Sequence, residues 1–313
     1  MTDTELKTPV RSMSDQVAVK PGQGLFMDIW YVAGRLDEVR PGASERFKIC
    51  GRELVIARDR NDLCTATLVD GEIHVPCEIS EDLIWVFIAE DPNDIDIKAP
   101  PPIFGGPKGK VRFMEKVVIP THLDDAAYGL LDPAHTPFVH RSPFWRGNEI
   151  LKEKRKTFAP SDFGFTMVPH TPVNSDIYKV IGGAITVRIA FRIPGLRAEY
   201  IENSKHTVLG LTALTPIDHE NTHLRQIFYW NSPVLNLARP IVPFFAKPFL
   251  QQDVDIMTLR RNNLEYGGKG MLLGDSDRQF LWYLSLKKAW EACGHDPAAF
   301  ENPLKTETLR WRT

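Results

Sequence analysis

The sequence predicts an α+β protein in which a small β-rich region precedes a larger region of antiparallel strands and helices. Three observations predict this order. Turn signals separate short apolar runs over residues 25–90, a proline-rich segment follows, and long alternating stretches over 150–230 precede helical patterns near the end. With 313 residues, the chain is long enough to bury a sizeable core and to form more than one domain.

The first region reads as a series of short strands. Phe47-Lys-Ile-Cys50 and Glu53-Leu-Val-Ile-Ala57 flank Gly51-Arg52, which predicts a hairpin that turns at these two residues. Leu83-Ile-Trp-Val-Phe-Ile-Ala89 is continuously apolar, as expected for a strand buried on both faces.

Composition predicts where this region ends. Residues 1–24 are polar and of mixed charge, and we expect a flexible N-terminal tail. A linker rich in proline and glycine follows residue 90, which places the first domain at 25–110 and a second domain at 111–313. The residues that mark the linker are Pro100, Pro101, Pro102, Gly105, Gly106 and Pro107.

The second region begins with a strand at 111–120 and a helical pattern at 123–138. The apolar segment 241–250 is interrupted by prolines, so we expect a loop or short helical turns there. Helices are predicted over 251–266 and 276–293.

Charge and targeting signals restrict the function classes. The chain has 38 Lys and Arg against 40 Asp and Glu, which argues against nucleic acid or an anionic membrane as the main partner. No secretory or transit pattern opens the sequence and no apolar run is long enough to span a bilayer, so we expect a cytoplasmic protein. Four scattered cysteines predict free thiols, since no CxxC pair is present.

One motif carries chemistry. Asp132-x-x-His135-x-x-x-x-His140 places two imidazoles five residues apart, and Pro137 between them should loosen the helix so that both can meet one ion. Two histidines and one carboxylate form the facial triad that binds Fe(II) and leaves positions open for O₂. Asp253, which opens a predicted helix, is the candidate third ligand, although it could also be an ordinary acid in a first helical turn.

A second histidine pair, His219-Glu-Asn-Thr-His223, fits the HExxH pattern of zinc proteases. Turn-forming residues surround it and an alternating run follows at Leu224, so we interpret it as a hairpin tip. His223 could instead face a substrate pocket.

Several segments together resemble the oxygenase components of Rieske non-haem iron hydroxylases, in particular those similar to vanillate O-demethylase. The resemblance covers about residues 25–265. It rests on Trp30-Tyr-Val-Ala-Gly-Arg-Leu-Asp-Glu-Val39, on Leu83-Ile-Trp-Val-Phe-Ile88, on Leu130-Leu-Asp-Pro-Ala-His-Thr-Pro-Phe-Val-His140 and on Gln252-Asp253.

The resemblance implies that His135, His140 and Asp253 bind Fe(II), with Asp255 as a weaker alternative ligand. It implies that Asp132 takes part in catalysis, by bridging the iron histidine of one subunit to the cluster histidine of its neighbour. It also implies a Rieske-like β domain, truncated here, followed by a helix-grip (START-like) domain in which a curved antiparallel sheet wraps a long helix. The implied reaction is O₂-dependent hydroxylation or O-demethylation of a small aromatic or apolar substrate, as in aromatic-compound catabolism. A reductase and ferredoxin would supply electrons to a homotrimer.

The sequence departs from the family at the [2Fe-2S] cluster, which needs a CxH and a later CxxH. Neither occurs between Leu25 and Glu90, where His74 is the only histidine and precedes Cys77 in the order HxxC. Cys293-Gly-His295 reads CxH but has no CxxH partner, and we interpret it as coincidence. Three explanations remain open: a segment missing from the sequence, electrons from another chain, or a binding protein that has lost catalysis and keeps the scaffold.

Overall fold

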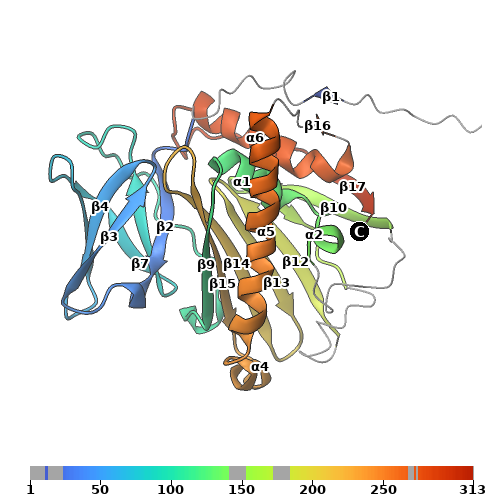
Figure 1. The fold of residues 1–313 in the computed structure, drawn as a ribbon, viewed down its shortest axis with the longest axis horizontal. Helices are drawn as coiled ribbons and strands as arrows, with labels where there is room; N and C mark the ends of the chain where they lie inside the picture. The colour runs from blue at the N-terminus through green and yellow to red at the C-terminus, as the bar shows by residue number, and fades with distance from the viewer. Residues whose placement is uncertain are drawn as a thin grey trace, which may run out of the picture.

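The computed structural model describes residues 11–12, 24–140, 153–171, 184–266, 271–272 and 274–312. These residues form helices and antiparallel sheets, the largest with eight strands, so the α+β class is confirmed at this level. Figure 1 shows a small β unit beside a large curved sheet, which the long helix α5 crosses.

The small β unit contains two sheets with strand orders β2-β8-β7 and β3-β4-β5-β6. The predicted hairpin is confirmed, but it turns at Cys50-Gly51 and not at Gly51-Arg52, because Ile49 pairs with Arg52. Both turn residues have positive φ, 52° and 81°, as the tight two-residue turns of hairpins require. All six residues of β8 are buried, as predicted. The elements of this unit are β2 Ile29–Arg35, η2 Leu36–Glu38, β3 Ala43–Ile49, β4 Arg52–Arg58, β5 Cys64–Leu68, β6 His74–Val75, β7 Cys77–Ser80 and β8 Leu83–Ile88.

The eight-stranded sheet has the order β17-β10-β11-β12-β13-β14-β15-β9. The sequence did not predict its edge strand β17, of which only Leu309 is buried, because so polar a segment carries little apolar alternation. Its strands, with the 3-10 helix η3 before them, are η3 Pro107–Gly109, β9 Phe113–Ile119, β10 Glu153–Ser161, β11 Gly164–Met167, β12 Thr186–Arg192, β13 Leu196–Glu202, β14 Thr207–Pro216, β15 Thr222–Trp230 and β17 Glu307–Arg312.

The helices differ from prediction in two places. The helical pattern over 123–138 is divided, because α1 ends at Leu131 and a separate single turn, α2, follows. The prediction of a loop over 241–250 was wrong, since α5 runs without a break from Val242 to Glu265. Pro243 lies in the first turn, where a helix needs no amide donor, and Pro248 is accommodated inside the helix. The helical elements are α1 Leu123–Leu131, α2 Thr136–Val139, α4 Pro233–Ala238, α5 Val242–Glu265, η4 Asp275–Asp277 and α6 Arg278–Ala292.

Each face of the large sheet has its own apolar core. One face packs against the β unit, with Trp30 and Trp85 on Leu209 and Leu211. The other face packs against α1, α5 and α6. The site lies on this helix-covered face.

A short two-stranded sheet involves the predicted tail, because Arg11–Ser12 (β1) pair with Met271–Leu272 (β16). No helix in the described ranges combines the length and the apolar character needed to cross a membrane.

Candidate metal centre

The two histidines of the motif are placed by the single turn α2. Asp132 caps the C-terminal end of α1, and its Oδ1 accepts the N–H of Ala134 at 2.8 Å. His135 and His140 flank α2 at its two ends, and their ring centroids lie 5.4 Å apart. Pro137 therefore helps to begin a new turn, where a proline is well tolerated, instead of loosening one long helix as predicted.

Asp253 reaches these rings from the long helix α5. Its Oδ1 lies 3.4 Å from Nε2 of His140 and 3.9 Å from Nε2 of His135. Asp255, the weaker alternative, lies outside this group, and its Oδ1 accepts a hydrogen bond from Gln251 at 2.9 Å. The structure thus brings together His135, His140 and Asp253, from two segments more than 110 residues apart.

Hydrogen bonds to Nδ1 define how each imidazole faces Asp253. Nδ1 of His135 lies 2.6 Å from the backbone oxygen of Asp132, and a carbonyl oxygen can only accept, so the proton sits on Nδ1. Nδ1 of His140 lies 3.3 Å from Oε1 of Gln252 and donates to it in the same way. In neutral rings both Nε2 lone pairs are therefore free and lie on the side of the carboxylate.

Burial shapes the protonation of all three groups. It raises the pKa of Asp253 to about 7. It lowers the pKa of His140 to about 4, and the neighbouring His135 contributes in the same direction. Burial also lowers the pKa of His135, against the opposing charge of Asp132. The site thus favours neutral imidazoles, which is the form that binds a metal.

The approach to the site is one-sided. The His140 side chain is only 1% exposed, and Phe249 of α5 stacks on its ring with centroids 3.7 Å apart. The side chains of His135 and Asp253 are 25% and 23% exposed. A ligand would reach the group from the side of His135 and Asp253.

The donor set fits a divalent transition metal. One ligand atom from each residue lies within 4.8 Å of the other two. Donor atoms about 2.1 Å from an ion and at right angles lie about 3 Å apart, so a small contraction would complete the geometry. His135, His140 and Asp253 could therefore hold a metal.

The other histidine motif lies where a hairpin tip was predicted. His219 occupies the turn between β14 and β15, and His223 is the second residue of β15. Neither belongs to a group of three or more possible metal ligands in the described ranges.

The thiols of Cys64 and Cys77 in the β unit are protonated, and a protonated thiol is a poor metal ligand. Burial raises the pKa of Cys77 to about 12 and also raises the pKa of Cys64, so both stay protonated at neutral pH. His74 lies 3.0 Å from the hydroxyl of Thr67. Across the described part of the β unit, no Cys joins a group of three possible ligands.

A second acidic group with a histidine lies where the β unit meets the C-terminal segment. Nδ1 of His295 is 2.7 Å from Asp28 and 3.6 Å from Glu90. Cys293, by contrast, contacts the backbone oxygen of Trp290, so the CxH pair does not converge. Asp28 also accepts the N–H of Glu90, and this cluster reads as an ion pair that joins distant segments.

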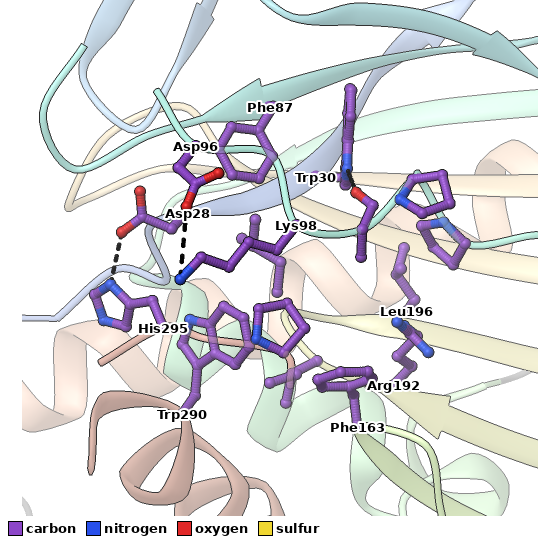
Figure 2. Close-up of a pocket in the computed structure, with 16 residues that line it drawn as sticks. Asp28, Trp30, Phe87, Asp96, Lys98, Phe163, Arg192, Leu196, Trp290 and His295 are labelled. Atoms are coloured by element: carbon purple, nitrogen blue, oxygen red, sulfur yellow. Dashed lines mark hydrogen bonds and ion pairs between the residues drawn. The ribbon is translucent and has the colours of Figure 1, made fainter. Parts of the chain in front are cut away.

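Beside that ion pair is a narrow cavity of about 40 Å³ (Figure 2). The rings of Trp30 and Phe87 lie on one side and those of Trp290 and Phe163 on the other. A space of this size holds a few water molecules, whereas a cavity of about 150 Å³ is needed for benzene. We therefore do not assign a substrate to it.

Several solved structures superpose on most of this chain. Dicamba monooxygenase bound to dicamba superposes with a TM-score of 0.65 at 15% identity, over 86% of this chain and 99% of that one. The chain has the fold of Rieske oxygenases. The quaternary ammonium Rieske monooxygenase CntA matches with a TM-score of 0.59 at 10% identity, over 84% and 89% of the two chains. The terminal oxygenase of carbazole 1,9a-dioxygenase from Nocardioides aromaticivorans matches at 0.56 and 11%, over 84% and 94%.

One further structure that matches is of dicamba monooxygenase with non-haem iron and dicamba, with a TM-score of 0.55 at 13% identity, over 85% and 98%. No protein-family profile matches the chain. No curated protein matches it either.

Two features of the site were not predicted. Gln252 was noted only as the neighbour of Asp253, and the stacking of Phe249 fell in the segment expected to be a loop. A helical reading of 242–265 would have placed Phe249 and Asp253 four residues apart on one face.

Proposed function

We propose that this protein is an oxygenase in which His135, His140 and Asp253 hold one Fe(II). The proposed reaction is O₂-dependent hydroxylation or O-demethylation of a small aromatic or apolar substrate. The convergence of two Nε2 atoms and one carboxylate carries the proposal. The oxygenase fold of the structural neighbours, one of which contains non-haem iron, supports it.

The side chains around the site have distinct tasks in this proposal. A bound Fe(II) would supply the reductive activation of O₂ beside the substrate. The Asp132 carbonyl and Gln252 hold the protons on Nδ1 and keep both Nε2 atoms available. Phe249 and the burial of His140 exclude water from one side. Exposure of His135 and Asp253 on the other side leaves room for O₂ and substrate.

This chain differs from the family that it resembles in how electrons could reach the iron. The family passes electrons from a [2Fe-2S] cluster, and residues 25–90 contain neither CxH nor CxxH. We propose that a ferredoxin and its reductase, or a cluster in another chain, supply the electrons. Asp132 remains the bridge that the resemblance implies, and its backbone oxygen lies 2.6 Å from Nδ1 of His135.

Assembly as a homotrimer is proposed from the same resemblance. Helix α4 and the first turn of α5 expose apolar side chains, which a neighbouring subunit could cover. They include Leu237 at 84% and Phe244 at 75% exposed. We retain 25–110 and 111–313 as the proposed domain limits.

A non-catalytic ligand-binding protein on the same scaffold is the second candidate. The missing cluster motif favours it, because iron without an electron source would not turn over. It predicts small-molecule binding without O₂ consumption.

Metal content and turnover decide between these functions. The oxygenase should contain about one iron per chain after reconstitution with Fe(II), and Asp253→Asn should remove most of it while keeping the shape of the side chain. Ferredoxin-coupled O₂ consumption with a panel of small aromatic compounds should then be abolished in the same variant. A wild-type protein that retains no iron would exclude the oxygenase.

A further inference from the structure

Two of the four cysteines lie in the β unit where the chain crosses from one of its sheets to the other. Cys64 begins β5 of the four-stranded sheet, and Cys77 begins β7 of the three-stranded sheet. Cys64 is 4% exposed, whereas Cys77 is partly exposed. Both thiols are free in this structure.

The strand register sets these two cysteines opposite one another. β5 pairs with β6 in antiparallel fashion, with Ala66 opposite Val75. Two residues further along the same register, Cys64 falls opposite Cys77, just after the chain passes Pro76 into the other sheet. Opposed residues of antiparallel strands have Cα atoms about 4.5–5.5 Å apart, and disulfides span Cα separations of about 4.4–6.8 Å. The register therefore gives the pair a spacing that suits a disulfide.

Both side chains point into the apolar interior between the two sheets. Buried positions alternate along β5, so Cys64 shares the inward face with Ala66 and Leu68. Cys77 pairs with Val86 of β8, which is fully buried in the same core, and so it faces this interior from the other sheet. The thiols are close enough that the charge of an ionised Cys64 raises the pKa of Cys77.

We propose that Cys64 and Cys77 form a redox-sensitive crosslink that ties the two sheets of the β unit together. The oxidant is a low-molecular-weight disulfide such as oxidised glutathione. Cys77, the accessible partner, loses its proton and attacks this disulfide, so that a mixed disulfide forms and one small thiol leaves. Cys64 then loses its proton and attacks the sulfur of Cys77, and the second small thiol leaves. Two electrons thus pass from the protein thiols to the small disulfide.

The surroundings of the thiols determine how fast the crosslink forms and breaks. Burial raises the pKa of Cys77 to about 12, with Cys64 and Glu78 acting in the same direction. Because the thiolate is the attacking form, oxidation should be slow at neutral pH and about tenfold faster for each added pH unit up to pH 9. A thiol of high pKa is also a poor leaving group, so the disulfide should resist reduction. The crosslink would therefore record sustained oxidation.

The other two cysteines provide matched controls. Cys50 lies in the β3–β4 turn beside the hydroxyl of Tyr31. Cys293 contacts the backbone oxygen of Trp290 near the end of α6. Neither is opposed to a cysteine in the strand pairings of the described residues.

Oxidation of the full-length protein, without denaturant, tests the proposal. Incubation with oxidised glutathione at about pH 8.5 should remove two free thiols and lower the intact mass by two hydrogen atoms. Glu72 lies between the two cysteines. Cleavage by a glutamate-specific protease should therefore leave the Cys64 and Cys77 fragments joined until a reductant is added. We expect the oxidised protein to melt about 3–10 °C higher than the reduced protein.

Variants assign the bond to this pair. Cys77→Ala and Cys64→Ala should each abolish the joined fragment and the rise in melting temperature. Cys77→Ala changes a partly exposed side chain, so it keeps the test valid even where Cys64→Ala disturbs the core. The double variant Cys50→Ala/Cys293→Ala keeps both partners and should form the crosslink at the wild-type rate.

Three outcomes would overturn the proposal: a persistent glutathione adduct on Cys77, a bond between any other pair of cysteines, or an unchanged number of thiols after prolonged oxidation. A crosslink that leaves the melting temperature unchanged would also overturn it, because the two sheets would then not be restrained. The crosslink needs no metal, so it is independent of the proposed oxygenase function.

Discussion

Gln252 and Asp253, adjacent on α5, contact the two nitrogens of one imidazole ring. Oε1 of Gln252 lies 3.3 Å from Nδ1 of His140, and Oδ1 of Asp253 lies 3.4 Å from Nε2 of the same ring. One helix turn therefore both orients this ring and supplies the acid that faces it.

Replacing Gln252 should weaken metal binding without removing a ligand. Gln252→Leu leaves Nδ1 of His140 without its acceptor, and loss of such an orienting group typically costs about 10- to 100-fold in metal affinity. Competition with a chromophoric chelator measures the change. The adjacent Gln251 is exposed and bonds only to Asp255 among the described residues, so Gln251→Leu should keep wild-type affinity. Equal losses in the two variants would contradict this role of Gln252.

Metal affinity should rise with pH through neutrality. The pKa of Asp253 is raised to about 7, so its carboxyl group is protonated below that pH, and the metal must displace the proton. His140, with a pKa lowered to about 4, is already neutral over this range. We expect about tenfold weaker binding at pH 6 than at pH 8, with little change above pH 8. In Asp253→Asn the binding that remains should be almost independent of pH over this interval.

Asp132 should matter more for turnover than for metal content. The group that orients His135 is the backbone oxygen of Asp132, which any substitution keeps, and Asn can still accept the N–H of Ala134. Asp132→Asn should therefore bind Fe(II) like the wild type, while ferredoxin-coupled O₂ consumption should fall, because the variant lacks the negative charge of the proposed bridge. Loss of iron from this variant would show that the carboxylate mainly maintains the metal geometry.

Glu81 should stabilise the junction between the β unit and the linker. Its carboxylate accepts the N–H groups of Phe104 at 2.7 Å and of Gly106 at 2.6 Å. Glu81→Ala leaves both donors without this acceptor, which should cost about 1–3 kcal/mol of unfolding free energy in urea titrations. Glu78 is exposed on the neighbouring strand, and Glu78→Ala should unfold at the wild-type midpoint.

Local patterns in the sequence predicted much of this fold. Residues 83–89 are continuously apolar and form a buried strand, and the turn residues after Phe47 predicted a hairpin to within one residue. Such features depend only on neighbours along the chain. The start of α5 was missed for the opposite reason, because Pro243 and Pro248 lower helical propensity and packing of the helix on the sheet outweighs them.

The candidate site was predictable in part for the same reason. His135 and His140 are close in sequence, so their spacing was informative, whereas Asp253 was assigned by resemblance and only the fold brings it to them. The role of Gln252 could not have been selected, since its contact with His140 arises only where α2 lies against α5. Residues whose roles arise from contacts between distant segments leave no signal in a single segment.

The short turn α2 and the helix α5 together hold His140 in place, and this affects how fast a bound metal ion would exchange. Loss of the His140 ligand requires α2 to separate from α5, because Phe249 covers this ring and α5 contacts it at both nitrogens. After that separation a metal would be held only by His135 and Asp253, which lie on the exposed side of the site. Mild destabilisation of α2 should therefore speed the escape of the ion well before the protein as a whole unfolds.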